Sequence, residues 1–144
     1  MINTQQVTET VVPESNRHGF LYRHLGKCAI LLEPIVFGAA RRLLPDYKGG
    51  LWALHELSNG GIYMSPEVSG PIRLESAELT GFAGDVSGDV AGIIVTLFAL
   101  DALVSVLTER GLEDEADVAC DLYHALRDYG LSHERAVEIY SAID

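Results

Sequence analysis

The chain has 144 residues, of which 48% are hydrophobic and 22% are charged, a composition that is typical of one folded domain and excludes a disordered chain. Its formal net charge of −11 at pH 7 repels nucleic acid at long range, so we expect no tight direct binding to DNA. The two cysteines lie outside any CxxC pair and favour a reduced, cytoplasmic setting over a disulfide scaffold.

The first predicted elements are a tail and a short helix. Residues 1–10 predict a disordered N-terminal tail, so the single domain is expected to span residues 11–144. Pro13 suits the first turn of a helix, where its missing amide hydrogen costs no hydrogen bond. Glu14 is favourable beside it, because the helix dipole is positive at that end.

A longer helix is predicted from about Lys27 to Leu44, before Pro45. Apolar residues recur there at near-helical spacing, at Leu31, Ile35, Ala39 and Leu43. Pro34 lies inside this window, so the helix either begins near Glu33 or bends at the proline.

The segment from Leu51 to Pro66 predicts a β-hairpin. Asn59-Gly60 supplies the two residues that tolerate positive φ in a two-residue type I′ turn. Such a turn would pair Leu57 with Ile62, Glu56 with Tyr63 and His55 with Met64.

Alternation then divides the hairpin into two faces. The more apolar face, expected to meet the helices, holds Leu51, Ala53, His55, Leu57, Ile62 and Met64. The other face mixes aromatic and acidic groups and holds Trp52, Leu54, Glu56, Tyr63 and Ser65. Ordinary packing under a loop or a helix explains this second face. The alternative hypothesis is that Trp52, Glu56 and Tyr63 contact a partner.

Two further strands and three helices are expected after the hairpin. The strands are Pro71–Leu74 and, more weakly, Leu79–Val86. The helices run from about Asp89 to Arg110 after a cap at Ser87 or Asp85, from Leu112 to Tyr129, and from a cap at Ser132 through Ile143. The apolar run from Ile93 to Leu100 is too short to predict a membrane span. The predicted class is α+β, with a small antiparallel β-meander of three to four strands packed against about four to five helices.

The predicted helix 112–129 is the strongest electrostatic feature. Glu113, Asp117 and Asp121 form a row at four-residue spacing, and the nearby carboxylates are Asp114, Glu115 and Asp128. An inward stripe is expected on another face, at Leu112, Ala116, Ala119, Leu122 or Tyr123, and Leu126. Residues 1–50 hold six Lys and Arg against four Asp and Glu, a net +2, whereas residues 51–144 hold four against seventeen, a net −13. A solvated face accounts for such a row, and contact with a basic, DNA-handling surface of a partner is the sharper hypothesis.

We expect no catalytic, cofactor-binding or metal site. His55-Glu56 lacks the second histidine of a zinc protease motif, and the glycine-rich segment 81–89 has no lysine for a phosphate loop. A rival interpretation is a small enzyme that uses His55, Glu56 and Tyr63.

Five segments of the chain resemble the ArdB/KlcA antirestriction family. They are Val12–Ser15, Phe20–Gly26, Gly49–Pro66, Gly92–Leu100 and Leu122–Tyr129. Members of this family are small proteins of mobile genetic elements that protect incoming DNA from the type I restriction enzymes of a bacterial host. The resemblance implies a non-enzymatic inhibitor of a type I restriction-modification complex, acting by protein–protein contact as a monomer or small homo-oligomer.

Mimicry of DNA by the whole molecule is not expected. A globule of this length is about 37 Å across, and that length of duplex carries about 22 phosphate charges, against a net charge of −11 here. The alternatives are an acidic decoy that competes with DNA locally and an accessory regulator of plasmid maintenance.

Overall fold

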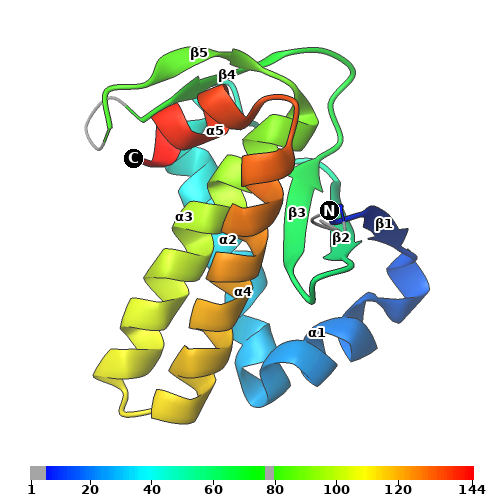
Figure 1. The fold of residues 1–144 in the computed structure, drawn as a ribbon, viewed down its shortest axis with the longest axis vertical. Coiled ribbons are helices and arrows are strands. Elements are labelled where there is room, and N and C mark those ends of the chain that lie inside the picture. Colours follow the sequence, from blue (N-terminus) through cyan, green and yellow to red (C-terminus); the bar gives the residue numbers. More distant parts are fainter. Residues whose placement is uncertain (1–5, 77–79) are drawn as a thin grey trace, which may run out of the picture.

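The 22-residue helix α3 (Gly88–Glu109) is the centre of the fold. The elements that pack against it most extensively are α2 (Ala29–Leu43), α4 (Glu113–Ser132) and β3 (Ile62–Pro66), as Figure 1 shows. By its length, and by a mean hydropathy of 2.4 over its most apolar window of 18 residues, α3 could span a membrane. Because 67% of that window is buried inside the fold, α3 is instead the kind of helix found in the core of a globular protein.

The structure is a computed structural model that describes residues 6–76 and 80–144. The remaining helices are α1 (Arg17–Leu25), α5 (Ala136–Ile143) and two short 3-10 turns, Glu14–Asn16 and Gly26–Cys28. The remaining strands are β1 (Glu9–Val12), β2 (Trp52–Leu57), β4 (Ile72–Glu75) and β5 (Ala83–Val86). The strands form two antiparallel sheets, β1–β2–β3 and β4–β5. The structure therefore confirms the predicted α+β class.

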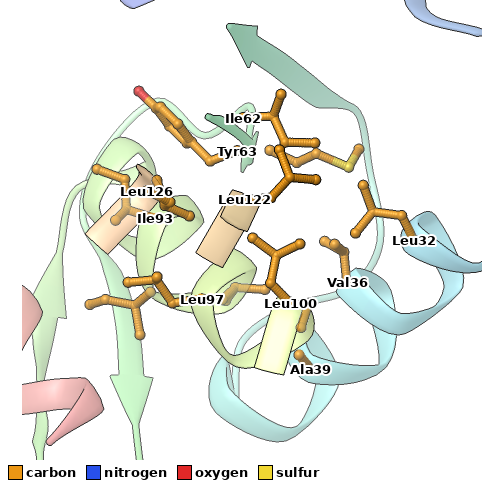
Figure 2. Close-up of a cluster of buried hydrophobic side chains, with 14 of the residues drawn as sticks. Leu32, Val36, Ala39, Ile62, Tyr63, Ile93, Leu97, Leu100, Leu122 and Leu126 are labelled. Atoms are coloured by element: carbon orange, nitrogen blue, oxygen red, sulfur yellow. The ribbon is translucent and has the colours of Figure 1, made fainter. Parts of the chain in front are cut away.

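Helix α2 continues through Pro34 instead of beginning after it. Pro34 has no amide hydrogen, so the Ile30 carbonyl lacks its usual donor within the helix. The helix continues despite the loss of this one hydrogen bond. The residues of α2 that are buried are Leu32, Val36, Ala39, Ala40 and Leu43. Figure 2 shows Val36 beside Leu100 of α3, with Leu32 one turn further along α2.

The prediction of which side of α2 is buried was wrong at its first two positions. Leu31 and Ile35 are only partly buried, whereas their neighbours Leu32 and Val36 are fully buried. The sequence alone was compatible with both stripes, because apolar residues occupy adjacent positions at 31–32 and 35–36. Packing against α3 selects between them.

Helix α3 covers the outer edge of β3. The Thr96 hydroxyl accepts a hydrogen bond of 3.1 Å from the Met64 amide and donates one of 3.2 Å to the Met64 carbonyl. Gly92 allows this approach, since a Cβ at that position would lie only 2.4 Å from the Met64 carbonyl oxygen. An edge that could pair with another chain is thus satisfied within the protein.

The register of the β2–β3 hairpin differs from the prediction by one residue. Glu56 pairs with Ile62, His55 with Tyr63 and Leu54 with Met64. The turn contains three residues, because the Leu57 amide bonds to the Gly61 carbonyl. Of the turn residues only Gly60 has a positive φ, at 89°. A three-residue turn with glycine in this conformation is a common hairpin connection, and it moves the pairing by one position.

This shift changes which side chains share a face, because side chains alternate with a period of two. His55 now lies beside Tyr63, whereas the prediction placed it with Ile62 and Met64. The two predicted faces of the hairpin were therefore wrong. The corrected register is what brings together the residues of the site described below.

The first sheet also contains a strand that was not predicted. The sequence predicted a disordered tail at residues 1–10, which is wrong for Glu9 and Thr10, because both lie in β1 and pair with β2. Residues 1–5 lie outside the described part of the chain. The strands predicted after the hairpin form the separate β4–β5 sheet, with Leu79 also outside the described residues.

Candidate functional site

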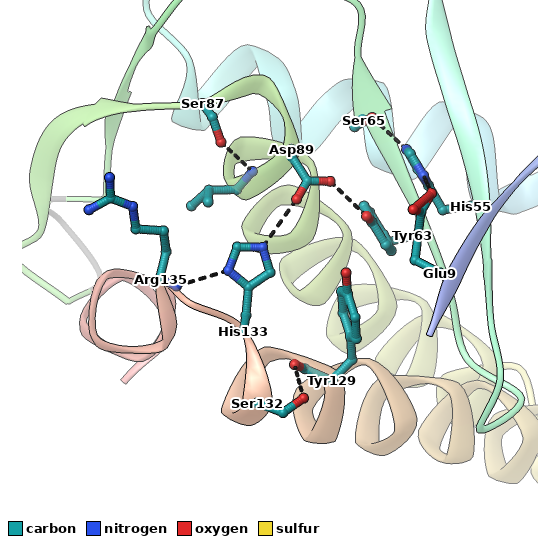
Figure 3. Close-up of polar contacts among 11 residues, drawn as sticks. Glu9, His55, Tyr63, Ser65, Ser87, Asp89, Tyr129, Ser132, His133 and Arg135 are labelled. Atoms are coloured by element: carbon teal, nitrogen blue, oxygen red, sulfur yellow. Dashed lines mark hydrogen bonds and ion pairs between the residues drawn. The ribbon is translucent and has the colours of Figure 1, made fainter. Parts of the chain in front are cut away.

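A polar cluster begins at Glu9 on β1, as Figure 3 shows. Its Oε1 lies 2.6 Å from His55 Nδ1, and His55 Nε2 lies 2.7 Å from Ser65 Oγ. Because a carboxylate only accepts hydrogen bonds, Nδ1 carries the hydrogen, and in the neutral ring Nε2 accepts the Ser65 hydroxyl hydrogen. His55 is 8% exposed and Ser65 is 7% exposed. The partly buried Glu9–His55 contact links β1 to the hairpin, and the buried His55–Ser65 bond links the two strands of the hairpin.

Tyr63 extends the cluster from the hairpin to α3 and α4. Its ring stacks on His55 with a centroid separation of 4.2 Å and lies 5.8 Å from the ring of Tyr129 on α4. Its hydroxyl donates a hydrogen bond of 2.7 Å to Asp89 Oδ1. Burial raises the pKa of Tyr63 above its ordinary value, and the bond to Asp89 raises it further. The phenol therefore remains a donor across the physiological pH range.

Asp89 connects the cluster to the turn between α4 and α5. Its Oδ2 lies 3.1 Å from Nε2 of His133, while Nδ1 of His133 accepts the Arg135 amide hydrogen at 2.9 Å. Since Nδ1 is an acceptor, the hydrogen of the neutral ring is on Nε2 and is donated to Asp89. Asp89 also lies in the first turn of α3, where the helix dipole favours a carboxylate.

The order Glu9, His55, Ser65 resembles the acid–base–nucleophile relay of a hydrolase. Acyl transfer also needs hydrogen-bond donors aimed at the oxyanion and space for a substrate. Ser65 is instead paired with Ala53 in the sheet, and α3 packs so closely over it that a Cβ at Gly92 would lie 2.5 Å from the Ser65 Cβ. These surroundings fit a structural junction of β1, the hairpin, α3 and the α4–α5 turn.

The sequence did not predict this junction, because its members are far apart in the chain. Glu9 and His55 are 46 positions apart, and Asp89 and His133 are 44 positions apart. The rival enzyme hypothesis joined His55 to Glu56, but Glu56 is exposed and Glu9 is the carboxylate that contacts the ring. A three-residue turn at Asn59-Gly60 would place Tyr63 beside His55, and this possibility was the only indication of the junction in the sequence.

The predicted partner-contact patch of Trp52, Glu56 and Tyr63 is not a surface in the structure. Trp52 is 4% exposed and donates its indole hydrogen to the Tyr47 hydroxyl. Tyr63 is 1% exposed and pairs with His55 instead of Glu56. Only Glu56 reaches solvent, so that hypothesis is wrong for the two aromatic residues.

The acidic residues predicted on helix 112–129 do reach the solvent, and we call this group the acidic face of α4. Five of them are exposed and Glu115 is partly exposed, and the face comprises Glu113, Asp114, Glu115, Asp117, Asp121 and Asp128. Within the described residues, none of the six forms an ion pair with a Lys, Arg or His side chain. The buried side of the helix holds Ala116, Ala119, Leu122 and Leu126, as predicted, whereas Leu112, also expected there, is 37% exposed.

The sequence is similar to several antirestriction proteins. A family model described as antirestriction protein matches residues 45–144. The chain is 43% identical to the antirestriction protein KlcA of Escherichia coli, over 96% of this chain and 94% of that protein. It is 38% identical to a second KlcA of the same species, over 99% and 100% of the two chains, and 30% identical to the putative antirestriction protein YubI, over 92% and 93%.

A solved structure is similar as well, with a TM-score of 0.88 and 40% sequence identity over 99% of this chain and 100% of that chain. It is described as showing that the KlcA and ArdB proteins have a novel fold and antirestriction activity against type I DNA restriction systems in vivo but not in vitro. Similarity in sequence and in fold thus extends over nearly the whole chain and confirms the resemblance seen in its motifs. The chain belongs to the antirestriction protein family that includes KlcA and ArdB.

Proposed function

We propose that this protein, as the product of a mobile genetic element, inhibits a type I restriction-modification complex in the cytoplasm of a bacterial host. The observation that carries the proposal is the similarity to KlcA and ArdB over nearly the full length of the chain. The inhibition occurs by protein–protein contact and involves no reaction catalysed by this chain. The burial of His55 and Ser65 and the internal hydrogen bonds of the Glu9–His55–Ser65 chain support the absence of catalysis there.

The acidic face of α4 is the surface that we assign to the partner. Within the described residues its six carboxylates form no ion pair with a cation of this chain, so a basic surface of another protein would attract them. The 20-residue helix is about 30 Å long, and a duplex of that length carries about 18 phosphate charges. Six carboxylates match a local basic site and not a length of DNA.

The proposal is tested in cells, because the related structure is described with activity in vivo but not in vitro. Unmodified plasmid or phage DNA is introduced into a host with an active type I system, with and without this protein. We expect the protein to raise the survival of unmodified DNA. Equal restriction in the two strains would reject the function itself.

The contact surface is tested with a triple variant in which Glu113→Gln, Asp117→Asn and Asp121→Asn remove three charges. We expect this variant to lose most of the protection. The matched control neutralises three exposed carboxylates outside α4, with Glu14→Gln, Asp46→Asn and Glu67→Gln, and should protect like the parent. Equal activity of both triple variants would place the contact elsewhere on the molecule.

The main alternative is a decoy that competes with DNA for its site on the enzyme. The unpaired carboxylates of α4 would serve that mechanism too, and pull-down of the restriction complex distinguishes the two. Added duplex DNA should displace a decoy completely, and moderate salt should weaken its binding steeply. We expect binding that survives saturating DNA.

A further inference from the structure

The outer edge of β1 is a sheet edge with which no other strand pairs in the part of the chain that the structure describes. β1 lies at the rim of the fold in Figure 1 and has a neighbouring strand, β2, on one side only. The opposite edge of the same sheet, at β3, is closed by Thr96 of α3. One sheet thus has an edge that is closed within the protein and an edge that is open.

The backbone groups that point out from this edge belong to Glu9 and Val11. Hydrogen bonding alternates along an antiparallel strand, so every second residue bonds to the same neighbour. The Ser58 amide donates to the Thr8 carbonyl, and Thr8 and Thr10 therefore direct their backbone groups toward β2. Those of Glu9 and Val11 point away from β2, and within residues 6–76 and 80–144 they form no other backbone hydrogen bond.

The side chains along this edge do not protect it from pairing. Charged side chains commonly protect strand edges, and the β4–β5 sheet has such charges at Arg73, Glu75 and Asp85, which form ion pairs with one another. On β1, by contrast, Val11 is 61% exposed and Thr10 is also exposed. Both are uncharged, β-branched residues that favour strands. The edge of β1 is therefore suited to pairing with a further strand.

Residues 9–11 are complementary to the same residues of a second copy of this chain. In an antiparallel pair centred on Thr10, Glu9 of each copy lies opposite Val11 of the other. Each such pair exchanges two backbone hydrogen bonds, and two-fold symmetry makes the two pairs equivalent. The two Thr10 residues meet at the axis as a pair without backbone bonds, where side chains are closest and paired threonines are favourable.

Other registers of the same two strands are less favourable. A shift of two residues in one direction places Glu9 opposite Glu9 of the other copy, and like charges at directly opposed positions are destabilising. The same shift in the other direction places Pro13 opposite Glu9, and proline has no amide hydrogen to donate. The register centred on Thr10 avoids both conflicts and satisfies the outward groups of both residues.

The distribution of charge favours this edge over other surfaces for contact between two copies. The net charge of −11 on each copy opposes association. Residues 1–50, which include β1, carry a net +2, and the excess of negative charge belongs to residues 51–144. Because β1 has only four residues, the contact area is small and the association is weak.

We propose that the protein forms a two-fold symmetric homodimer in which the β1 strands of two copies pair in antiparallel orientation, centred on Thr10. The sheets of the two copies become one continuous sheet, and the outward backbone groups of Glu9 and Val11 are satisfied. The proposal goes beyond the inhibitory function above and does not use the acidic face of α4. Each can therefore fail without the other.

Sedimentation velocity of the full-length protein, from low micromolar to millimolar concentration, tests the association. We expect an equilibrium of monomer and dimer in which salt increases the dimer fraction, because screening reduces the repulsion between two acidic copies. Amide hydrogen exchange at Glu9 and Val11, followed by NMR, should become slower as the dimer forms.

Charge variants locate the two-fold axis. Thr10→Lys and Thr10→Glu each place like charges opposite each other, so each variant alone should lose the dimer. An equal mixture of the two variants should recover it as a heterodimer, because the opposed charges then attract. Thr108→Lys and Thr108→Glu are the matched controls, since they make the same changes of net charge at an exposed position of α3, and they should retain the dimer. Circular dichroism confirms that each variant is folded.

Four outcomes overturn the proposal. Three are a monomer at every concentration, equal dimerisation of the parent and the Thr10 charge variants, and a mixture of these variants that stays monomeric. The second of these would place the contact between copies on another surface. The fourth is slow amide exchange at Glu9 and Val11 that does not depend on concentration, which would show that the edge is closed within a single copy.

Discussion

Tyr63 illustrates how one residue depends on the whole cluster around it. Its ring is stacked on His55, its hydroxyl donates to Asp89, and it is almost fully buried. Burial and the neighbouring carboxylate both favour the neutral phenol, so the folded-state pKa lies above the unfolded value of about 10. The stability that results is complete below pH 10 and is lost as the pH rises above it, because the unfolded chain ionises first.

The first prediction concerns the hydroxyl of this residue. Tyr63→Phe should lower the free energy of unfolding by about 1–3 kcal/mol near pH 7, since Asp89 keeps the donor His133 but loses the donor to its Oδ1. It should also reduce the loss of stability between pH 10 and 11. Urea titrations at several pH values measure both effects. Tyr22→Phe, at an exposed ring, is the control and should change neither; equal losses in the two variants would contradict the role of the Asp89 bond.

At the scale of elements, α3 combines two tasks. Its apolar side chains form the core between α2 and α4, and its Thr96 and Gly92 complete the edge of β3. An edge strand with unpaired backbone groups is open to pairing with other chains. The Thr96 side chain belongs to a helix, but it therefore completes the backbone hydrogen bonding of a strand in the sheet.

The second prediction compares two threonines of α3. Thr96→Val should cost about 1–3 kcal/mol, because the Met64 amide and carbonyl would be left buried without partners. Thr108→Val should cost little, since Thr108 is exposed and bonds only to the Val104 carbonyl within its own helix. Chemical denaturation of both variants measures the difference. Equal stability of the two variants would show that water or a local shift satisfies Met64.

The third prediction compares two helical glycines. Gly92→Ala should destabilise the protein by about 1–3 kcal/mol or more, because its Cβ would overlap the Met64 carbonyl and Ser65. Gly38→Ala should instead stabilise it by about 0.5–1 kcal/mol, since its Cβ meets no atom within 4 Å and alanine favours a helix. Thermal melting of the two variants gives the sign of each change. A stabilising Gly92→Ala would contradict the close packing of α3 on β3.

At the scale of the whole molecule, the surface charge is strongly negative and one-sided. The net −13 of residues 51–144 includes the acidic face of α4, whose six carboxylates form no ion pair within the part of the chain that the structure describes. These carboxylates repel one another, and this repulsion opposes folding. A basic partner surface would reduce it. The same charges thus weaken the free protein and provide the contact proposed above.

The fourth prediction follows from this repulsion. The melting temperature should rise as sodium chloride is increased from low to physiological ionic strength, because salt screens exposed like charges. In the triple variant that neutralises Glu113, Asp117 and Asp121, the rise should be smaller and the protein more stable at low salt. Differential scanning fluorimetry at several salt concentrations measures both. A melting temperature that falls with salt in the parent would contradict net repulsion.

The helices were predicted well because their signals are local. Ser87 caps α3 through the Val90 amide as expected, and the buried stripe of α4 follows the spacing in the sequence. Predicted ends differ from the observed ones by a few residues, as at α4, which continues through Gly130 to Ser132. The acidic face follows from the same periodicity, so its residues could be named before the structure.

The sheet was predicted less well because its signals are not local. Asn59-Gly60 indicates a hairpin but is compatible with turns of two or three residues, and the choice moves every cross-strand neighbour by one position. β1 has only four residues and joins a strand more than 40 positions away. No pattern inside Glu9–Val12 indicates that pairing.

The sequence by itself determined the α+β class, the approximate positions of the main helices, the buried stripe of α4 and membership of the antirestriction family, because periodicity, caps and motifs are properties of neighbouring residues. Only the tertiary structure decided the hairpin register, the place of β1 and its open edge, and the Glu9–His55–Ser65 and Tyr63–Asp89–His133 contacts. The physical reason is that these features depend on which distant side chains pack against each other, and packing selects among arrangements that local propensity leaves nearly equal.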